Sequence, residues 1–175
     1  MRPKHFSIPN GLFFLSVHCA RGIKPFTNER ACTTYLNVLK KKVVDLEIKL
    51  FGYVVMPDHV HLLLQQPEQM TLEKLMNHIN GASAREINKQ QNTVGEKLWQ
   101  GGFHDVFLRE AIDFAIKVNY IHNNPVKAGL VVHPENYSFS SAKTYVSKIG
   151  SSLLVVKDFD KYSLENIVKQ INGIL

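Results

Sequence analysis

Apolar residues along the chain follow two spacings, which predict strands alternating with helices. Strand-like apolar runs occupy 11–18, 48–56, 59–65 and about 103–108. Between them apolar residues recur every three or four positions, which predicts helices capped near Thr27 or Asn28 and at Thr71, and a third from about 110 to Asn124. Pro125 is expected to end the third helix, because proline lacks the amide hydrogen of the helical ladder.

This order of elements, β-α-β-β-α-β-α, favours one fold class. It is typical of an α+β, ferredoxin-like or RRM-like two-layer sandwich, with an antiparallel sheet and helices mainly on one face. Pro57-Asp58 is a tight-turn dipeptide, so 48–56 and 59–65 should form a hairpin. We assign residues 1–146 to the domain and 147–175 to a C-terminal extension packing on it, with a short amphipathic helix at 163–172.

The second strand of the hairpin carries two histidines, His59 and His61. Residues two apart in a strand share a face, so Val60, Leu62 and Leu64 should point to a helical layer and both imidazoles to the other side. Two neighbouring imidazoles suit one divalent metal ion. The pattern is short, and two half-buried histidines without a ligand remain an alternative.

The third predicted helix carries a tyrosine that its apolar stripe does not explain. The stripe contains the apolar residues that cluster on one side at helical spacing: Ala111, Phe114, Ala115, Val118 and Ile121. Tyr120 is predicted on the opposite face, with Asn124 one turn later. Both residues have structural alternatives, Tyr120 against another surface and Asn124 as a cap of the following turn.

A tyrosine facing two histidines and a metal ion would make a phosphoryl-transfer site. A phenol is a poor nucleophile at its ordinary pKa of about 10. Its proton is lost more easily near a divalent cation and an in-line phosphate. Asn124 would supply a third, oxygen ligand.

Composition narrows the class of protein. The 175 residues, 45% of them hydrophobic, are enough for one core, and the net charge of +6 favours a polyanionic partner. The sequence shows no apolar run long enough to cross a bilayer. Its two cysteines fit a reduced, cytoplasmic protein better than a disulfide scaffold.

Three segments together resemble a known family. They are MPDHVHL at 56–62, LWQG at 98–101 and YIHNNPVKAGLV at 120–131. In this order they are similar to the REP-associated tyrosine transposases, relatives of the single-tyrosine insertion-sequence transposases of the HUH superfamily. The resemblance extends from about residue 10 to 146 and includes YSFSS at 137–141.

The resemblance implies roles for four residues. His59 and His61 would hold Mg²⁺ or Mn²⁺, Tyr120 would be the nucleophile, and Asn124 would take the place of the family's carboxamide ligand, often Gln in insertion-sequence members. It also implies cleavage of single-stranded DNA near imperfect hairpins, either repetitive extragenic palindromes or element ends. The products would be a 5′-phosphotyrosine and a free 3′-hydroxyl. Relatives of this kind imply a monomer or a homodimer.

Side chains around the motifs are candidates for DNA contacts. Four basic residues are expected to hold phosphates: Lys97, Arg109, Lys117 and Lys127. Three aromatic residues are expected to stack on unpaired bases: Trp99, Phe103 and His104. For Trp99 a position in the core is an equally strong alternative.

Two other function classes remain beside the transposase. A non-catalytic nucleic-acid-binding protein would share the fold and the basic surface, although it would need neither the histidine pair nor the tyrosine. A zinc hydrolase would use the histidines, but the sequence lacks a convincing H-E-x-x-H or C-x-x-C companion set.

Overall fold

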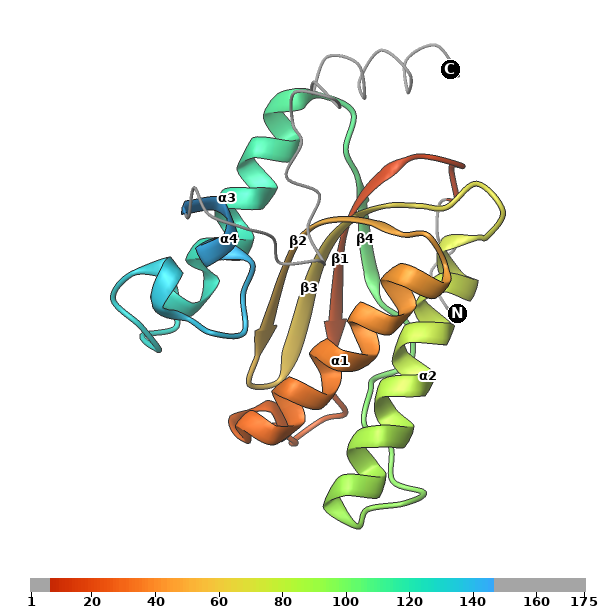
Figure 1. The fold of residues 1–175 in the computed structure, drawn as a ribbon, viewed down its shortest axis with the longest axis vertical. Helices are drawn as coiled ribbons and strands as arrows, with labels where there is room; N and C mark the ends of the chain where they lie inside the picture. Colours follow the sequence, from red (N-terminus) through yellow and green to blue (C-terminus); the bar gives the residue numbers. More distant parts are fainter. Residues whose placement is uncertain (1–6, 147–175) are drawn as a thin grey trace.

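The computed structural model describes residues 7–146, which form a four-stranded antiparallel sheet with helices on both faces (Figure 1). The strands are β1 (Leu12–His18), β2 (Lys49–Met56), β3 (His59–Gln65) and β4 (His104–Phe107), in the order β2-β3-β1-β4. The helices are α1 (Glu29–Asp45), α2 (Leu72–Gln91), α3 (Ala111–Lys127) and α4 (Ala142–Val146), with 3-10 turns η1 (Pro25–Thr27) and η2 (Pro134–Asn136). The predicted α+β class, the antiparallel sheet and the hairpin are confirmed.

Local capping explains where the first two helices begin. The Asn28 side chain accepts a hydrogen bond from the Arg30 amide at 2.9 Å, and the Thr71 hydroxyl accepts one from the Lys74 amide at 3.3 Å. Each bond satisfies one of the amides that a helix leaves unpaired at its start. Both caps agree with the sequence prediction.

The larger core lies between the sheet and the pair α1 and α2, which Figure 1 shows side by side across the same face. Val60, Leu62 and Leu64 of β3 point into this core and are fully buried, as the two-residue period predicts. Tyr35 of α1 and Met76 of α2 meet them there. Burying each of the aliphatic side chains and Met76 stabilises the fold by roughly 1.5–3 kcal/mol.

The predicted layout has helices mainly on one face, and helix α3 adds partial cover to the opposite face. Phe114 and Ile121 of α3 are buried in a second core against Leu12, Val54 and Leu63. The strands are therefore apolar on both faces along much of their length, and such a sheet needs cover on both sides. Among residues 7–146, no helix covers this face at the end where His18 lies exposed and His59 partly exposed.

The prediction that α3 ends at Asn124 was wrong, because Pro125 lies inside the helix. The helix continues to Lys127, and the Ala128 amide still donates to the Asn124 carbonyl at 3.0 Å. A proline in the last turn removes a single ladder bond, so the helix tolerates it there. Gly129 then ends the turn with a left-handed φ of 69°.

The segment after α3 runs along the outer edge of β2. The Val55 amide donates to the Phe139 carbonyl at 2.9 Å, and the Ser141 amide donates to the Tyr53 carbonyl at 3.0 Å. The Tyr137 hydroxyl donates to the Val55 carbonyl at 2.8 Å. This pairing covers an otherwise open strand edge. The predicted extension 147–175, with its helix at 163–172, lies outside the described residues.

Candidate active site

The two motif histidines lie side by side on the face that α3 partly covers. The ring centroids of His59 and His61 are 4.7 Å apart, with the rings tilted by 66°. His61 is only 4% exposed, and within residues 7–146 neither of its ring nitrogens has a hydrogen-bond partner. Burial lowers the pKa of His61 to about 3, so the ring is neutral near pH 7. A buried neutral imidazole with an unused lone pair is suited to bind a metal ion.

The neighbouring Asp58 orients His59. The Asp58 carboxylate oxygen Oδ1 lies 2.7 Å from His59 Nδ1. An ionised carboxylate only accepts hydrogen bonds, so in the neutral ring Nδ1 carries the proton and Nε2 keeps its lone pair. The hydrogen bond to His59 also lowers the pKa of Asp58. From the sequence Asp58 was a turn residue; its position directly before the first histidine was the available signal.

These observations fit a divalent metal ion held by His59 and His61. Among the side chains that the structure describes, no group of three or more His, Cys, Asp or Glu is arranged to hold one. A third protein ligand would therefore come from another residue type. Asn124 is such a candidate: it is partly buried and lies one turn after Tyr120 on α3.

Tyr120 meets the histidine pair across the gap between α3 and the sheet. Its ring centroid lies 5.3 Å from that of His61 and 5.6 Å from that of Phe14, and the residue is 38% exposed. Tyr120 thus lies at the margin of the sheet-facing side of α3, and its predicted place opposite the apolar stripe was wrong. The stripe itself is narrower than expected, since Ala115 is exposed.

Two lysines flank the tyrosine. Lys117 Nζ lies 4.6 Å from the centroid of the Phe14 ring and 5.8 Å from that of Tyr120. Lys127 Nζ lies 5.6 Å from the Tyr120 ring centroid. Positive charge on both sides of the phenol suits an anionic group such as a phosphate.

Two of the three aromatic residues expected to stack on bases lie in the core instead. The Trp99 indole Nε1 donates to the Asn80 carbonyl and the Ser83 hydroxyl, each at 3.1 Å, and Phe103 is 8% exposed in the core under α1 and α2. Neither ring has an exposed face for a base. The stacking prediction was wrong for Phe103, and for Trp99 the alternative position in the core is the one observed. The other candidates are exposed: Lys97, His104 and Arg109.

His18 belongs to the same face and was missed from the sequence. It pairs with His59 across β1 and β3, and the two rings stack with centroids 5.2 Å apart. The two-residue period of β1 was the available signal, because Phe14, Ser16 and His18 alternate with apolar residues that face the larger core.

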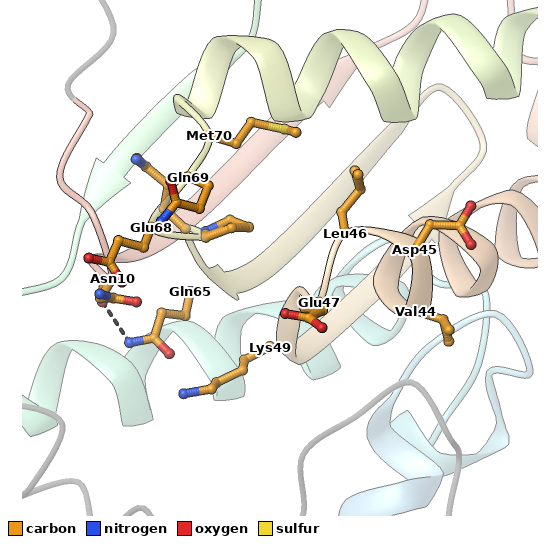
Figure 2. A pocket seen from close by; sticks show the side chains of 12 residues that line it. Asn10, Val44, Asp45, Leu46, Glu47, Lys49, Gln65, Glu68, Gln69 and Met70 are labelled. Atoms are coloured by element: carbon orange, nitrogen blue, oxygen red, sulfur yellow. Dashed lines mark hydrogen bonds between the residues drawn. The ribbon is translucent and has the colours of Figure 1, made fainter.

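A pocket of about 580 Å³ lies at the other end of the strands, beyond Gln65 (Figure 2). Asp45, Glu47 and Glu68 contribute carboxylates to its wall. Figure 2 shows the Gln65 amide bonded to the Asn10 carbonyl, a contact of 2.7 Å. The carboxylates would repel a phosphate, so the pocket is unsuited to DNA.

Comparison with known proteins identifies the family. The family model described as "Transposase IS200 like" matches residues 17–124, a stretch that includes the histidine pair, Tyr120 and Asn124. The chain belongs to this family. It is a DNA-binding transposase, an enzyme that cleaves and transfers DNA strands, as the motif resemblance predicted.

Individual relatives agree with this assignment. The REP-associated tyrosine transposase of Escherichia coli (strain K12) is 26% identical over 144 residues, covering 79% of this chain and 80% of that protein. A Haemophilus influenzae protein named as a candidate REP-associated tyrosine transposase is also 26% identical over 144 residues, covering 75% of this chain and 79% of its own. A solved REP-associated tyrosine transposase bound to a REP hairpin has a TM-score of 0.70 at 20% identity, covering 90% of this chain and 95% of that one, and so shares the fold. No helix among residues 7–146 is long and apolar enough to cross a membrane.

Proposed function

We propose that this transposase is a single-tyrosine enzyme of the HUH type that cleaves and rejoins single-stranded DNA beside imperfect hairpins. One observation carries the proposal: the ring centroids of Tyr120 and His61 lie 5.3 Å apart. His61 is a buried histidine whose ring nitrogens lack partners among the described residues. A nucleophile thus stands next to a prepared ligand. Two similar proteins support a hairpin substrate. One is the REP-associated tyrosine transposase of Escherichia coli, and the other is a solved REP-associated tyrosine transposase that is bound to a REP hairpin.

The Tyr120 hydroxyl is the group that reacts with DNA. Its oxygen attacks the scissile phosphorus and loses its proton, while the bond from phosphorus to the 3′ oxygen breaks and that oxygen takes up a proton. The 5′ end stays on the protein as a phosphotyrosine, and the reverse reaction joins it to another 3′-hydroxyl. A Mg²⁺ or Mn²⁺ ion held by His59 and His61, with Asn124 as third ligand, would neutralise charge on the phosphate oxygens.

The two flanking lysines position the phosphate. Lys117 and Lys127 place ammonium groups within 6 Å of the Tyr120 ring centroid, at 5.8 and 5.6 Å. They attract the DNA backbone to the phenol without reading its sequence. Lys97 and Arg109 are exposed as well. Lys97 lies near the His18 end of β1 and Arg109 near the Leu12 end, so each could hold a phosphate at a different end of the sheet.

The covalent intermediate provides the test. Wild type and Tyr120→Phe are incubated with 3′-labelled hairpin DNA and Mn²⁺, denatured and separated on a gel. Wild type should give a labelled protein–DNA adduct that peptide mapping places at Tyr120, and Tyr120→Phe should give none. Tyr137→Phe is the matched control, because its hydroxyl bonds to the Val55 carbonyl and it should keep the adduct.

Metal dependence is tested in the same assay. His59→Ala and His61→Ala should each lose cleavage while still binding the hairpin. Cleavage that persists in Tyr120→Phe, or wild-type cleavage that releases a free 5′-phosphate without an adduct, would indicate water as the nucleophile. Cleavage at the wild-type rate by either histidine variant would refute the proposed metal site.

A further inference from the structure

The sheet face beside the proposed site continues as a row of exposed imidazoles. In the strand register Ser16 pairs with His61 on one side and with His104 on the other, and His18 pairs with His59. Residues directly opposite each other in an antiparallel sheet point to the same face. His18 and His104 therefore share the face of the two motif histidines, and both are exposed.

The rings form a track from the site toward the sheet edge. His18 stacks on His59 with centroids 5.2 Å apart, and His104 meets His18 edge-on at 6.4 Å. We call His59, His18 and His104 the imidazole track. Val106, the next residue of β4 on this face, is 43% exposed. Helix α3 buries the other end of the face through Phe114 and Ile121, so it leaves the track uncovered.

Basic residues lie near the track. Lys24 is close enough to Asp58 to interact with its charge. The Gln100 amide donates to the His18 carbonyl at 2.9 Å and the Ala20 amide to the Leu98 carbonyl at 2.8 Å, which places Lys97 at the end of β1. Planar rings with cations beside them form the kind of surface on which single-stranded nucleic acid binds, with bases stacked on the rings and phosphates held by the cations.

We propose that the unpaired DNA strand flanking the cleaved phosphate crosses β1 and β4, with bases stacked on His18 and His104. This inference rests on the proposed function, since it takes its substrate from there. It assigns a role to His18, and it replaces Trp99 and Phe103, whose rings are buried, as the partners of unpaired bases.

The test compares two DNA ligands in EDTA, so that metal binding does not contribute. One is a hairpin with a short single-stranded tail carrying 2-aminopurine, and the other is the same hairpin without a tail. Wild type should bind the tailed hairpin more tightly and change the 2-aminopurine fluorescence. His18→Ala and His104→Ala should each reduce affinity for the tailed hairpin by about 5-fold or more, the lower range for one lost base stack, and leave the tail-less hairpin unchanged. His78→Ala, at an exposed histidine of α2, is the control and should behave as wild type.

Aromatic replacements separate stacking from the other roles of a histidine. His18→Phe and His104→Phe keep a flat ring and lose the nitrogens, so both should retain binding of the tailed hairpin. A loss in the Phe variants equal to that in the Ala variants would overturn stacking. Equal wild-type affinity for the two hairpins would overturn the path of the strand while leaving the proposed function standing. Failure of wild type to bind either hairpin would overturn both.

Discussion

Removing the carboxylate of Asp58 should weaken binding of the proposed metal ion, although Asp58 is not one of its proposed ligands. The 2.7 Å contact from Asp58 Oδ1 to His59 Nδ1 holds the proton on Nδ1 and leaves Nε2 free to bind the proposed metal ion. In Asp58→Ala the ring is free to rotate, and both tautomers are populated. Part of the binding free energy is then spent on selecting the tautomer and orientation that bind the metal.

The structure sets the size of the effect. Loss of an outer-shell partner of this kind typically costs about 10- to 100-fold in metal affinity. The side chain of Asp58 is 47% exposed and that of His59 is 19% exposed, so water competes for the contact and the lower end applies. We expect about a 10-fold weaker affinity in Asp58→Ala. Asp58→Asn should lose less, because the amide oxygen can still accept from Nδ1.

Calorimetric titration of metal-free protein with Mn²⁺ measures this directly. Wild type, Asp58→Ala and Asp58→Asn are compared with Glu68→Ala, which removes an exposed carboxylate at the far end of the strands. The control should bind Mn²⁺ as wild type does. Melting temperatures of the metal-free proteins should agree closely, since an exposed ion pair adds little stability. An unchanged affinity in Asp58→Ala, with the fold intact, would refute the idea that Asp58 orients His59.

Three further outcomes follow from the site and its supports. Lys117→Gln and Lys127→Gln should each reduce the slope of log affinity against log salt by about 0.7–0.9 for hairpin DNA, whereas Lys41→Gln on α1 should not; unchanged slopes would remove both lysines from the interface. His61→Phe should stabilise the metal-free protein by about 1 kcal/mol, seen as a higher melting temperature, because it removes buried ring nitrogens that lack partners among the described residues. A lower melting temperature, or one that Mn²⁺ still raises, would contradict the proposal that His61 is a metal ligand. Burial lowers the pKa of His122 from 6.5 to about 4, so protonation favours the unfolded chain and the free energy of unfolding should fall as the pH drops from about 6.5 toward 4. In urea titrations His122→Gln should lessen that fall by up to about 1.4 kcal/mol per pH unit. An unchanged pH dependence in this variant would contradict the role of His122.

Local patterns in the sequence predicted the elements well. The boundaries of the β2–β3 hairpin follow from an apolar run interrupted by Pro57-Asp58, and the caps at Asn28 and Thr71 follow from side chains that bond to nearby amides. These features depend on residues close together in the chain. The same holds for the shared face of His59 and His61, which is a property of any strand.

Features that depend on contacts between distant segments were predicted less well. Helical spacing alone places Tyr120 away from the apolar stripe, yet the sheet presents Phe14 and His61 to that flank of α3. Trp99 has the composition of a base-stacking residue, but Asn80 and Ser83 of α2 supply partners for its indole nitrogen inside the core. Neither the position of Tyr120 nor that of Trp99 can be predicted from the residue type alone, because burial depends on which distant segments pack against the side chain.

The motif that revealed the family combines chemistry with scaffold. Within 120–131, Ile121 and Pro125 are buried, and His122 bonds through Nε2 to the Ser141 hydroxyl at 2.9 Å. That hydroxyl also accepts the Tyr53 amide of β2 at 3.0 Å, so the YSFSS segment joins α3 to the strand that pairs with β3. The link sets the distance between the helix that carries the tyrosine and the strand that carries the histidines. His122 and Tyr120 lie only two residues apart on one helix, so a displacement of Ser141 that moves His122 would also move the Tyr120 hydroxyl. The residues that make the motif specific are therefore as much those that hold α3 on the sheet as those that would touch DNA.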